Sequence, residues 1–190
     1  MKKKFMTLAA VLCCAMSLTM FTACGSDDDN DKDKDSNNTV QEYDATPVAA
    51  VLECSFEVSK DMLSVLDMTV EYYDNDGKLQ TEKLTQKKWT KTVKAKLPAS
   101  LGACLKAQLK DGVDVNTIDA IKLLRGYSCK GYSVTATGDM ASNFKGNSNR
   151  SSITLKGEDL LSVLSEEGGV LISYLYDFAD NGKVVDGSWK

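Results

Sequence analysis

The sequence contains no histidine among its 190 residues. Histidine is the base of Ser-His-Asp and Cys-His nucleophile systems and a frequent zinc ligand, so its absence excludes these kinds of site together. No glycine-rich loop precedes a predicted helix, which excludes a Walker-type phosphate site and a dinucleotide fingerprint. We therefore expect no cofactor and no metal.

Carboxylates are the chemistry that remains, with 27 Asp and Glu against 23 Lys and Arg. Two carboxylates suffice for glycoside hydrolysis, so a small carboxylate-based glycoside hydrolase stays open as an alternative. It would need a cleft holding two acids, at least one of them with a raised pKa. Because the sequence shows no readable catalytic motif, we predict a protein that is not an enzyme.

The cysteines do not form a disulfide scaffold, although there are six of them. Two lie in an N-terminal apolar run and a third, Cys24, ends it. Cys54, Cys104 and Cys129 remain, an odd number without metal-type spacing. At most one disulfide can form among them, and its existence is left open. Cys54 alternates with apolar residues and is predicted in the core, whereas Cys104 alternates with polar residues and is predicted on a polar face.

The N-terminus begins with three lysines and continues as an apolar run from Phe5 to Ala23. A basic start, an apolar core and small residues before a cut point are typical of a secretory signal. The run is about as long as the minimum for a spanning helix, but it ends at aspartates instead of the Lys or Arg of a stop-transfer flank. We expect residues 1–23 to be a signal peptide.

Thr22-Ala23-Cys24 resembles the lipobox of bacterial lipoproteins, which signal peptidase II cuts before the cysteine. The resemblance implies a diacylglyceryl thioether and an N-acyl chain, such as palmitate, on Cys24. Several acyl chains on one residue give stable membrane anchoring where a single chain does not.

Ser26, Asp27, Asp28 and Asp29 follow the lipobox cysteine almost directly. They resemble the acidic lipoprotein export signal of Bacteroidota, which implies the outer membrane with the protein facing the cell exterior. The whole chain resembles the small outer-membrane lipoproteins common in Bacteroidales, a likeness that implies no activity.

Residues 24–46 read as the lipidated cysteine and an acidic, disordered tether, because their composition cannot bury enough apolar surface to fold. The tether carries seven Asp and one Glu against two Lys and the signal carries three Lys, so −1 of the total charge of −4 is left for residues 47–190. A near-neutral domain has no electrostatic footprint for nucleic acid.

From Ala49 onward, apolar and polar residues alternate with a period of two, which predicts β-strands. Asp74–Gly77 and Asp180–Gly182 are predicted hairpin turns, and neither fits the spacing of a calcium loop. Strands are predicted at 49–58, 68–73, 79–84, 88–97, 103–109, 118–128, 131–137, 153–155, 170–176 and 184–189, a polar loop at 143–151, and one helix at 158–167.

These elements predict one domain over residues 47–190, an antiparallel β-sandwich of immunoglobulin- or transthyretin-like type with one short helix near 158–167. Ser59–Leu66 matches Gly157–Leu164 in register, and each is followed by a tyrosine-rich strand and a hairpin turn. We interpret this match as an internal pseudo-repeat.

The leading functional prediction is a non-catalytic, lipid-anchored cell-surface protein that binds or adheres to a glycan or a protein. Trp89 and Trp189 could belong to a sugar-stacking platform, but the pattern favours a core position for Trp89 and an outward position for Tyr73. The alternative is an accessory or assembly subunit of an outer-membrane complex, which predicts an edge strand or apolar patch that stays exposed.

Overall fold

The computed structural model describes residues 45–166 and 168–189. Within them the chain forms nine strands, two α-helices and one 3-10 helix. In chain order these are β1 (Pro47–Glu57), α1 (Lys60–Val65), β2 (Leu66–Tyr73), β3 (Leu79–Lys83), β4 (Lys88–Lys96), β5 (Ala99–Leu109), η1 (Val115–Thr117), β6 (Ile121–Thr135), β7 (Met140–Leu155), α2 (Gly157–Glu166), β8 (Val170–Phe178) and β9 (Val184–Asp186).

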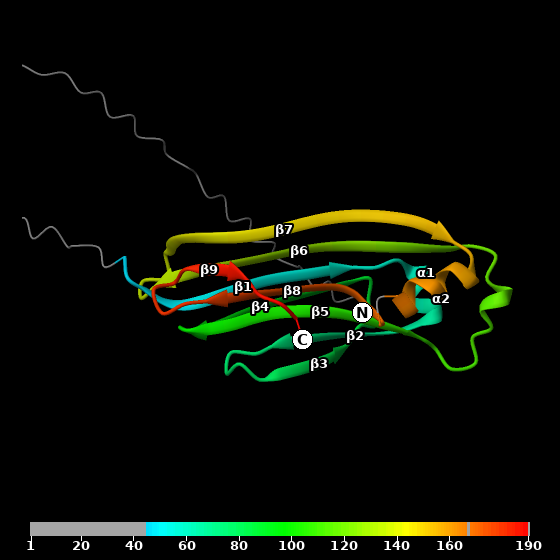
Figure 1. Cartoon of the computed structure of the whole chain (residues 1–190), viewed down its shortest axis with the longest axis horizontal. Helices are drawn as coiled ribbons and strands as arrows, with labels where there is room; N and C mark the ends of the chain where they lie inside the picture. The colour runs from blue at the N-terminus through cyan, green and yellow to red at the C-terminus, as the bar shows by residue number, and fades with distance from the viewer. Residues whose placement is uncertain (1–44, 167, 190) are drawn as a thin grey trace, which may run out of the picture. The chain divides into compact units, whose positions relative to one another are not determined.

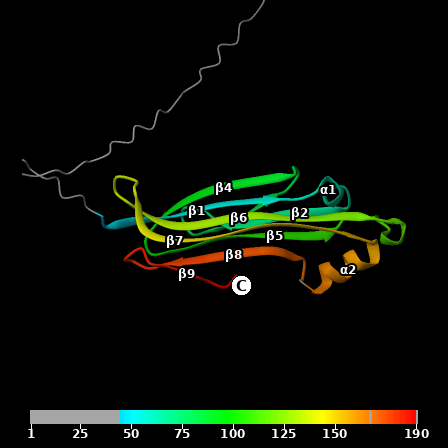
Figure 2. The same ribbon diagram turned by 90° about the horizontal axis from the view of Figure 1, so that it is seen from above.

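The strands build two layers (Figure 1). One sheet has the order β4-β1-β6-β7 and the other the order β3-β2-β5-β8-β9, and the paired strands of both are antiparallel. Both helices lie at one end of the sandwich (Figure 2), and the three hairpin loops that join β2–β3, β6–β7 and β8–β9 lie at the other. The predicted antiparallel β-sandwich is confirmed, with two α-helices in place of the one predicted.

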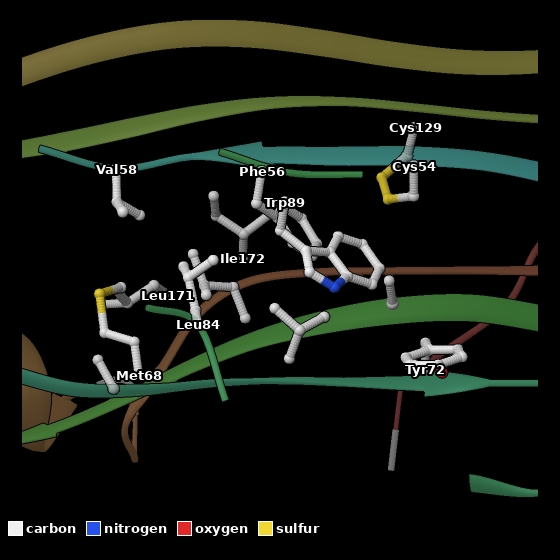
Figure 3. Packing of buried hydrophobic residues seen from close by; sticks show 14 of the residues in the cluster. Cys54, Phe56, Val58, Met68, Tyr72, Leu84, Trp89, Cys129, Leu171 and Ile172 are labelled. Carbon is white, nitrogen blue, oxygen red and sulfur yellow. A yellow bond between two sulfur atoms is a disulfide. The ribbon is translucent and has the colours of Figure 1, made fainter. Parts of the chain in front are cut away.

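The core lies between the inner faces of the two sheets (Figure 3). On β1 the predicted apolar face is buried, and Phe56 stacks on Trp89 of β4 with ring centroids 5.5 Å apart. Cys54 of β1 and Cys129 of β6 are direct cross-strand neighbours and form a disulfide. The pairing that the sequence left open is therefore an internal link of the four-stranded sheet.

The described chain crosses from one sheet to the other through an α-helix on two occasions. Ser59 caps α1 by accepting a hydrogen bond from the backbone N–H of Met62 at 3.0 Å, which satisfies a free helical donor. Gly157 begins α2, and a Cβ at this position would lie 1.9 Å from the carbonyl oxygen of Val115. The segments β1-α1-β2-β3 and β7-α2-β8-β9 share one element order, and their origin as a repeat stays a prediction.

The structure of β6 and β7 differs from the sequence-based prediction. Two strands joined near Lys130-Gly131 were expected, but β6 runs without interruption from Ile121 to Thr135. The stretch 143–151 was expected to be a polar loop and instead belongs to the 16-residue strand β7. Its residues are mostly exposed on both faces, so the alternation by which strands are recognised in sequence does not arise.

The hairpins predicted at Asp74–Gly77 and Asp180–Gly182 are confirmed, and both have three-residue loops. In the first, Asp74 donates to the Lys78 carbonyl and Gly77 donates back to the Asp74 carbonyl. Gly77 has φ of 73°, a backbone conformation that glycine adopts without strain. A third loop of this pattern, closed by Gly138, joins β6 to β7.

Candidate interaction edge

The strand β7 is an edge strand of the four-stranded sheet and the longest strand of the described chain. It pairs with β6 from Ile121↔Leu155 to Val134↔Met140. Within residues 45–166 and 168–189, no strand pairs with its other side. β7 therefore presents a long row of backbone donors and acceptors, and we call this strand the open edge.

Large apolar side chains are exposed along the open edge. Met140 is 56% exposed, Phe144 55% and Ile153 54%. Protein edges are ordinarily protected by charge, by proline, by short length or by a covering element. The open edge combines free backbone groups with exposed apolar side chains, which is the feature that the accessory-subunit alternative predicts.

The charged residues of β7 are Lys145 and Arg150, and each contacts a carboxylate of this chain. Arg150 donates from Nε and Nη2 to the two carboxylate oxygens of Glu57 on β1, both at 3.0 Å. This contact lowers the pKa of the Glu57 carboxyl. Lys145 forms an ion pair with Asp186 on β9. Both cations are thus paired with acids of the same chain, which weakens their ability to keep another strand from pairing with the edge.

A cleft of about 420 Å³ separates the open edge from the five-stranded sheet. Its lining includes Phe144 and Asn147 from β7, Tyr174 and Tyr176 from β8, and Asp186 from β9. The cleft arises because β9 has only three residues and leaves the inner face of β7 uncovered beyond Asp186.

Two tyrosines fix the floor behind this cleft. Tyr174 packs against Tyr127 of β6 with ring centroids 4.9 Å apart, and burial raises the Tyr174 pKa. Tyr176 donates its hydroxyl to the Cys129 carbonyl at 3.3 Å, next to the disulfide. The cleft is therefore aromatic inside and polar at its mouth.

The opposite edge of the sandwich, where β3 and β4 meet, is closed. Glu82 of β3 accepts hydrogen bonds from Lys91 Nζ at 2.6 Å and from Trp89 Nε1 and the Tyr72 hydroxyl at 2.7 Å each. These bonds, with that from Lys91 the strongest, lower the pKa of Glu82 to about 2. Lys91 lies on the otherwise apolar face of β4, and its contact with Glu82 accounts for a charged residue at this position.

Trp89 and Tyr73, the two aromatic residues whose positions the sequence predicted, differ in burial. Trp89 is buried, as the sequence predicted. Tyr73, expected to project outward, is half-buried because Trp189 lies against it with ring centroids 5.3 Å apart.

Cys104 lies on the polar outer face of β5, as its sequence neighbours predicted, but it is not accessible there. It is fully buried, and desolvation raises its pKa to about 11. β5 is the central strand of its sheet, and the Lys106–Glu71 ion pair, at 2.7 Å, lies beside the thiol on the outer face. A polar face at the centre of a sheet is thus covered by its own long side chains.

Among residues 45–166 and 168–189, the carboxyl groups with a shifted pKa all have it lowered. They occur at Glu57, Asp67, Asp74 and Glu82, in each case through a hydrogen bond from a cation or a backbone N–H. A general acid of a glycoside hydrolase requires a shift in the other direction. Among the described residues there is also no cluster of three or more metal-ligating His, Cys, Asp or Glu side chains.

The residues predicted to anchor and export the protein lie outside the described part of the chain. They are Cys24, Ser26, Asp27, Asp28 and Asp29. Among the helices that the structure does describe, none has the length and apolar character needed to cross a membrane.

Comparison with known proteins returned no matching family model, no matching curated protein and no matching solved structure.

Proposed function

We propose that this chain is a lipid-anchored, non-catalytic cell-surface protein that binds an extended segment of a protein partner at the open edge. The observation that carries the proposal is β7 itself, an unguarded 16-residue edge strand with three exposed apolar side chains. The sequence predicted a binding module for glycan or protein, and the edge favours protein.

The free side of an edge strand is chemically specific for another polypeptide backbone. Its N–H and C=O groups alternate at the spacing of a β-ladder, about 3.3 Å per residue, and an added strand satisfies them. Every second side chain of that added strand would point toward the cleft lined by Phe144 and Tyr174. Backbone pairing would supply affinity and the cleft would supply selectivity.

The disulfide supports an exported location. Cys54–Cys129 links two strands of the core, and such bonds persist in oxidising compartments and are rare in the cytosol. This agrees with the signal peptide, the lipobox at Cys24 and the outer-membrane position proposed from the sequence.

Edge binding is tested with displayed peptides of roughly ten residues, enough for one strand. Peptides are selected on the full chain in detergent and then measured against two variants. Asn147→Lys with Asn149→Lys adds two charges to the open edge, and the matched control, Thr90→Lys with Thr92→Lys, adds two to β4. We expect the first variant to lose at least about tenfold in affinity and the control to bind normally.

Equal binding by both variants would contradict the proposal. The other possible occupant of the edge is a second copy of this chain, which sedimentation of the chain without peptide examines. If the chain forms a dimer and the Asn147→Lys, Asn149→Lys variant does not, the edge binds a second copy.

Location is tested by protease treatment of intact cells, with the wild type compared with a variant in which Asp27, Asp28 and Asp29 are changed to Ala. Removal of the wild type and protection of the variant would support surface display. Protection of both would place the domain inside the envelope and favour the accessory or assembly subunit, which would use the same edge for a partner in the membrane.

A further inference from the structure

The outer face of the four-stranded sheet carries an excess of positive charge. Residues that alternate with the buried ones along each strand point to this face. Over the four strands they include two acids, Glu53 and Glu57, and six cations. The cations are Lys88, Lys94 and Lys96 of β4, Lys122 and Lys130 of β6, and Arg150 of β7. Because residues 47–190 together are close to neutral, positive charge is concentrated on this side, which we call the basic face.

The five lysines of the basic face have no acidic partner in the described part of the chain, where none lies within 4.0 Å of a carboxylate. On the outer face of the five-stranded sheet, by contrast, Lys83 is paired with Asp67 at 2.9 Å and Lys106 with Glu71 at 2.7 Å. Ammonium groups that are gathered on one face and not neutralised attract an anion. The basic face therefore favours an anionic ligand.

A row of hydroxyl side chains crosses the middle of the basic face. It consists of cross-strand neighbours, Thr90 of β4, Ser55 of β1, Ser128 of β6 and Ser148 of β7. Neighbouring strands are about 4.8 Å apart, so the row is roughly 14 Å long. Among the residues that the structure describes, none forms a hydrogen bond with these four hydroxyls. Their hydrogen-bonding capacity is available to a ligand.

Longer side chains flank the hydroxyl row on both sides, so the row forms the floor of a trough. Along one side lie Lys88, Glu57 and Arg150, and along the other lie Glu53 and Lys130. A hollow of about 260 Å³ lies on this floor, and its lining includes Glu53, Ser55, Thr90, Thr92, Ser128 and Lys130. We call the row with its two walls the hydroxyl trough.

Glu53 is an acceptor in the wall of the trough, and Tyr132 holds it in place. The Tyr132 hydroxyl donates to Glu53 Oε1 at 2.7 Å. The Tyr132 ring packs on a small apolar cluster of the same face, formed by Ala49, Val51 and Val134. Within the described chain Glu53 Oε2 receives no hydrogen bond, so it can accept one from a ligand hydroxyl. The same carboxylate repels an anion that has no hydroxyl to donate.

We propose that the hydroxyl trough binds an acidic polysaccharide, a chain of sugars that bear carboxylates or sulfates. Lys88 and Lys130, on opposite walls, supply donors for the anionic groups. The hydroxyls of the floor and Glu53 exchange hydrogen bonds with the sugar hydroxyls. This is a second binding function on the face of the sheet, whereas strand binding at the open edge uses the free backbone side of β7.

The test measures binding of four polymers to the full chain in a non-ionic detergent by calorimetry, at about 0.15 M salt, which screens attraction beyond roughly 8 Å. Polygalacturonate and chondroitin sulfate are acidic polysaccharides, dextran is a neutral one, and polyphosphate is an anion without sugar hydroxyls. We expect one or both acidic polysaccharides to bind at least about tenfold more tightly than dextran and polyphosphate.

Three results would overturn the proposal. Polyphosphate binding as tight as that of the acidic polysaccharides would show attraction by charge alone. Equally tight binding of dextran would show that the lysines take no part. Failure of both acidic polysaccharides to bind would leave the trough without its ligand class.

Loss of floor hydroxyls locates the site. Thr90→Val with Ser128→Val removes two hydroxyls from the floor and should weaken the tighter polysaccharide at least about fivefold. The matched control, Thr81→Val with Ser173→Val, removes two exposed hydroxyls from the outer face of the five-stranded sheet and should change affinity less than about twofold. Urea unfolding reports whether each variant is folded.

Loss of wall charges gives a second, independent reading. Lys88→Gln with Lys130→Gln should also weaken the polysaccharide at least about fivefold. The control Lys60→Gln with Lys183→Gln removes the same charge from exposed positions outside the basic face and should have less than about a twofold effect. Wild-type affinity in either folded trough variant, or a control that loses as much as its partner, would contradict the site.

Discussion

At each long side of the sandwich an edge strand of one sheet lies next to an edge strand of the other, and the two sides differ in how this junction is closed. Where β3 and β4 meet, Glu82 joins the sheets through two hydrogen bonds, from Lys91 and Trp89, and Trp89 fills the space between them. Where β7 and β9 meet, one exposed ion pair, Lys145–Asp186, spans the sheets in front of an open cleft. The first side is sealed and the second is accessible.

The edge strands of the four-stranded sheet repeat this difference. β4 carries lysines along its exposed face, a common protection against pairing with another chain. β7 is longer, and its two cations are engaged by acids of the same chain. Because one molecule protects one edge and leaves the other accessible, the accessibility of β7 is not a general property of this fold, and this selectivity is the reason to assign it a function.

The largest difference between the two sides is expected from loss of an aromatic ring. Trp89→Ala should lower the free energy of unfolding by about 3–5 kcal/mol, because it leaves a cavity in the core. Phe144→Ala should change it by less than about 0.5 kcal/mol, because the ring is 55% exposed. Urea unfolding of the two variants checks this contrast, which would fail if their losses were similar.

The disulfide joins the two halves of the four-stranded sheet and gives the next largest effect. Cys54→Ala with Cys129→Ala opens a link between residues 75 apart in sequence and should lower the free energy of unfolding by about 2–4 kcal/mol. Cys104→Ala serves as a control for the loss of sulfur. Thermal unfolding under non-reducing conditions measures the effect, and identical curves for the double variant and the wild type would show that the link is not formed.

The sealed side should be sensitive to acid. Glu82 has its pKa lowered from 4.5 to about 2, so its contribution is present above about pH 4.5 and is lost as the pH falls toward 2. The contribution should be about 1 kcal/mol, because solvent screens a side chain that is 39% exposed. Glu82→Gln should therefore be less stable than the wild type at neutral pH and should converge with it near pH 2. If the stability difference between Glu82→Gln and the wild type stays constant with pH, the charge of Glu82 does not stabilise this side.

The sealed side was largely predictable from sequence and the accessible side was not. The period of two along β1, β2 and β4 reports strands with one buried face, and it placed Trp89 and Phe56 in the core correctly. β7 has no buried face over most of its length, so its Asn, Ser and Gly residues indicated a loop. Its strand conformation comes from pairing with β6, a contact between chain segments that local composition does not encode.

Lys91 and Cys104 also show that local sequence does not determine contacts between strands. Lys91 breaks the apolar pattern of β4 because its partner, Glu82, comes from another strand. The polar neighbours of Cys104 in sequence predicted its face of the sheet, whereas its burial depends on the strands on either side of β5. Pairing across strands thus decided both outcomes, and the open edge and the cleft beside it could be recognised only once the strands were paired.

The most direct test of the accessible edge is amide hydrogen exchange of the full chain with and without a selected peptide. We expect the peptide to slow exchange along β7, between Met140 and Leu155, and to leave β4 unchanged, because an added strand would occupy the free donors of β7 alone. Protection confined to β4, or to residues outside both edges, would contradict the proposal that β7 is the binding element.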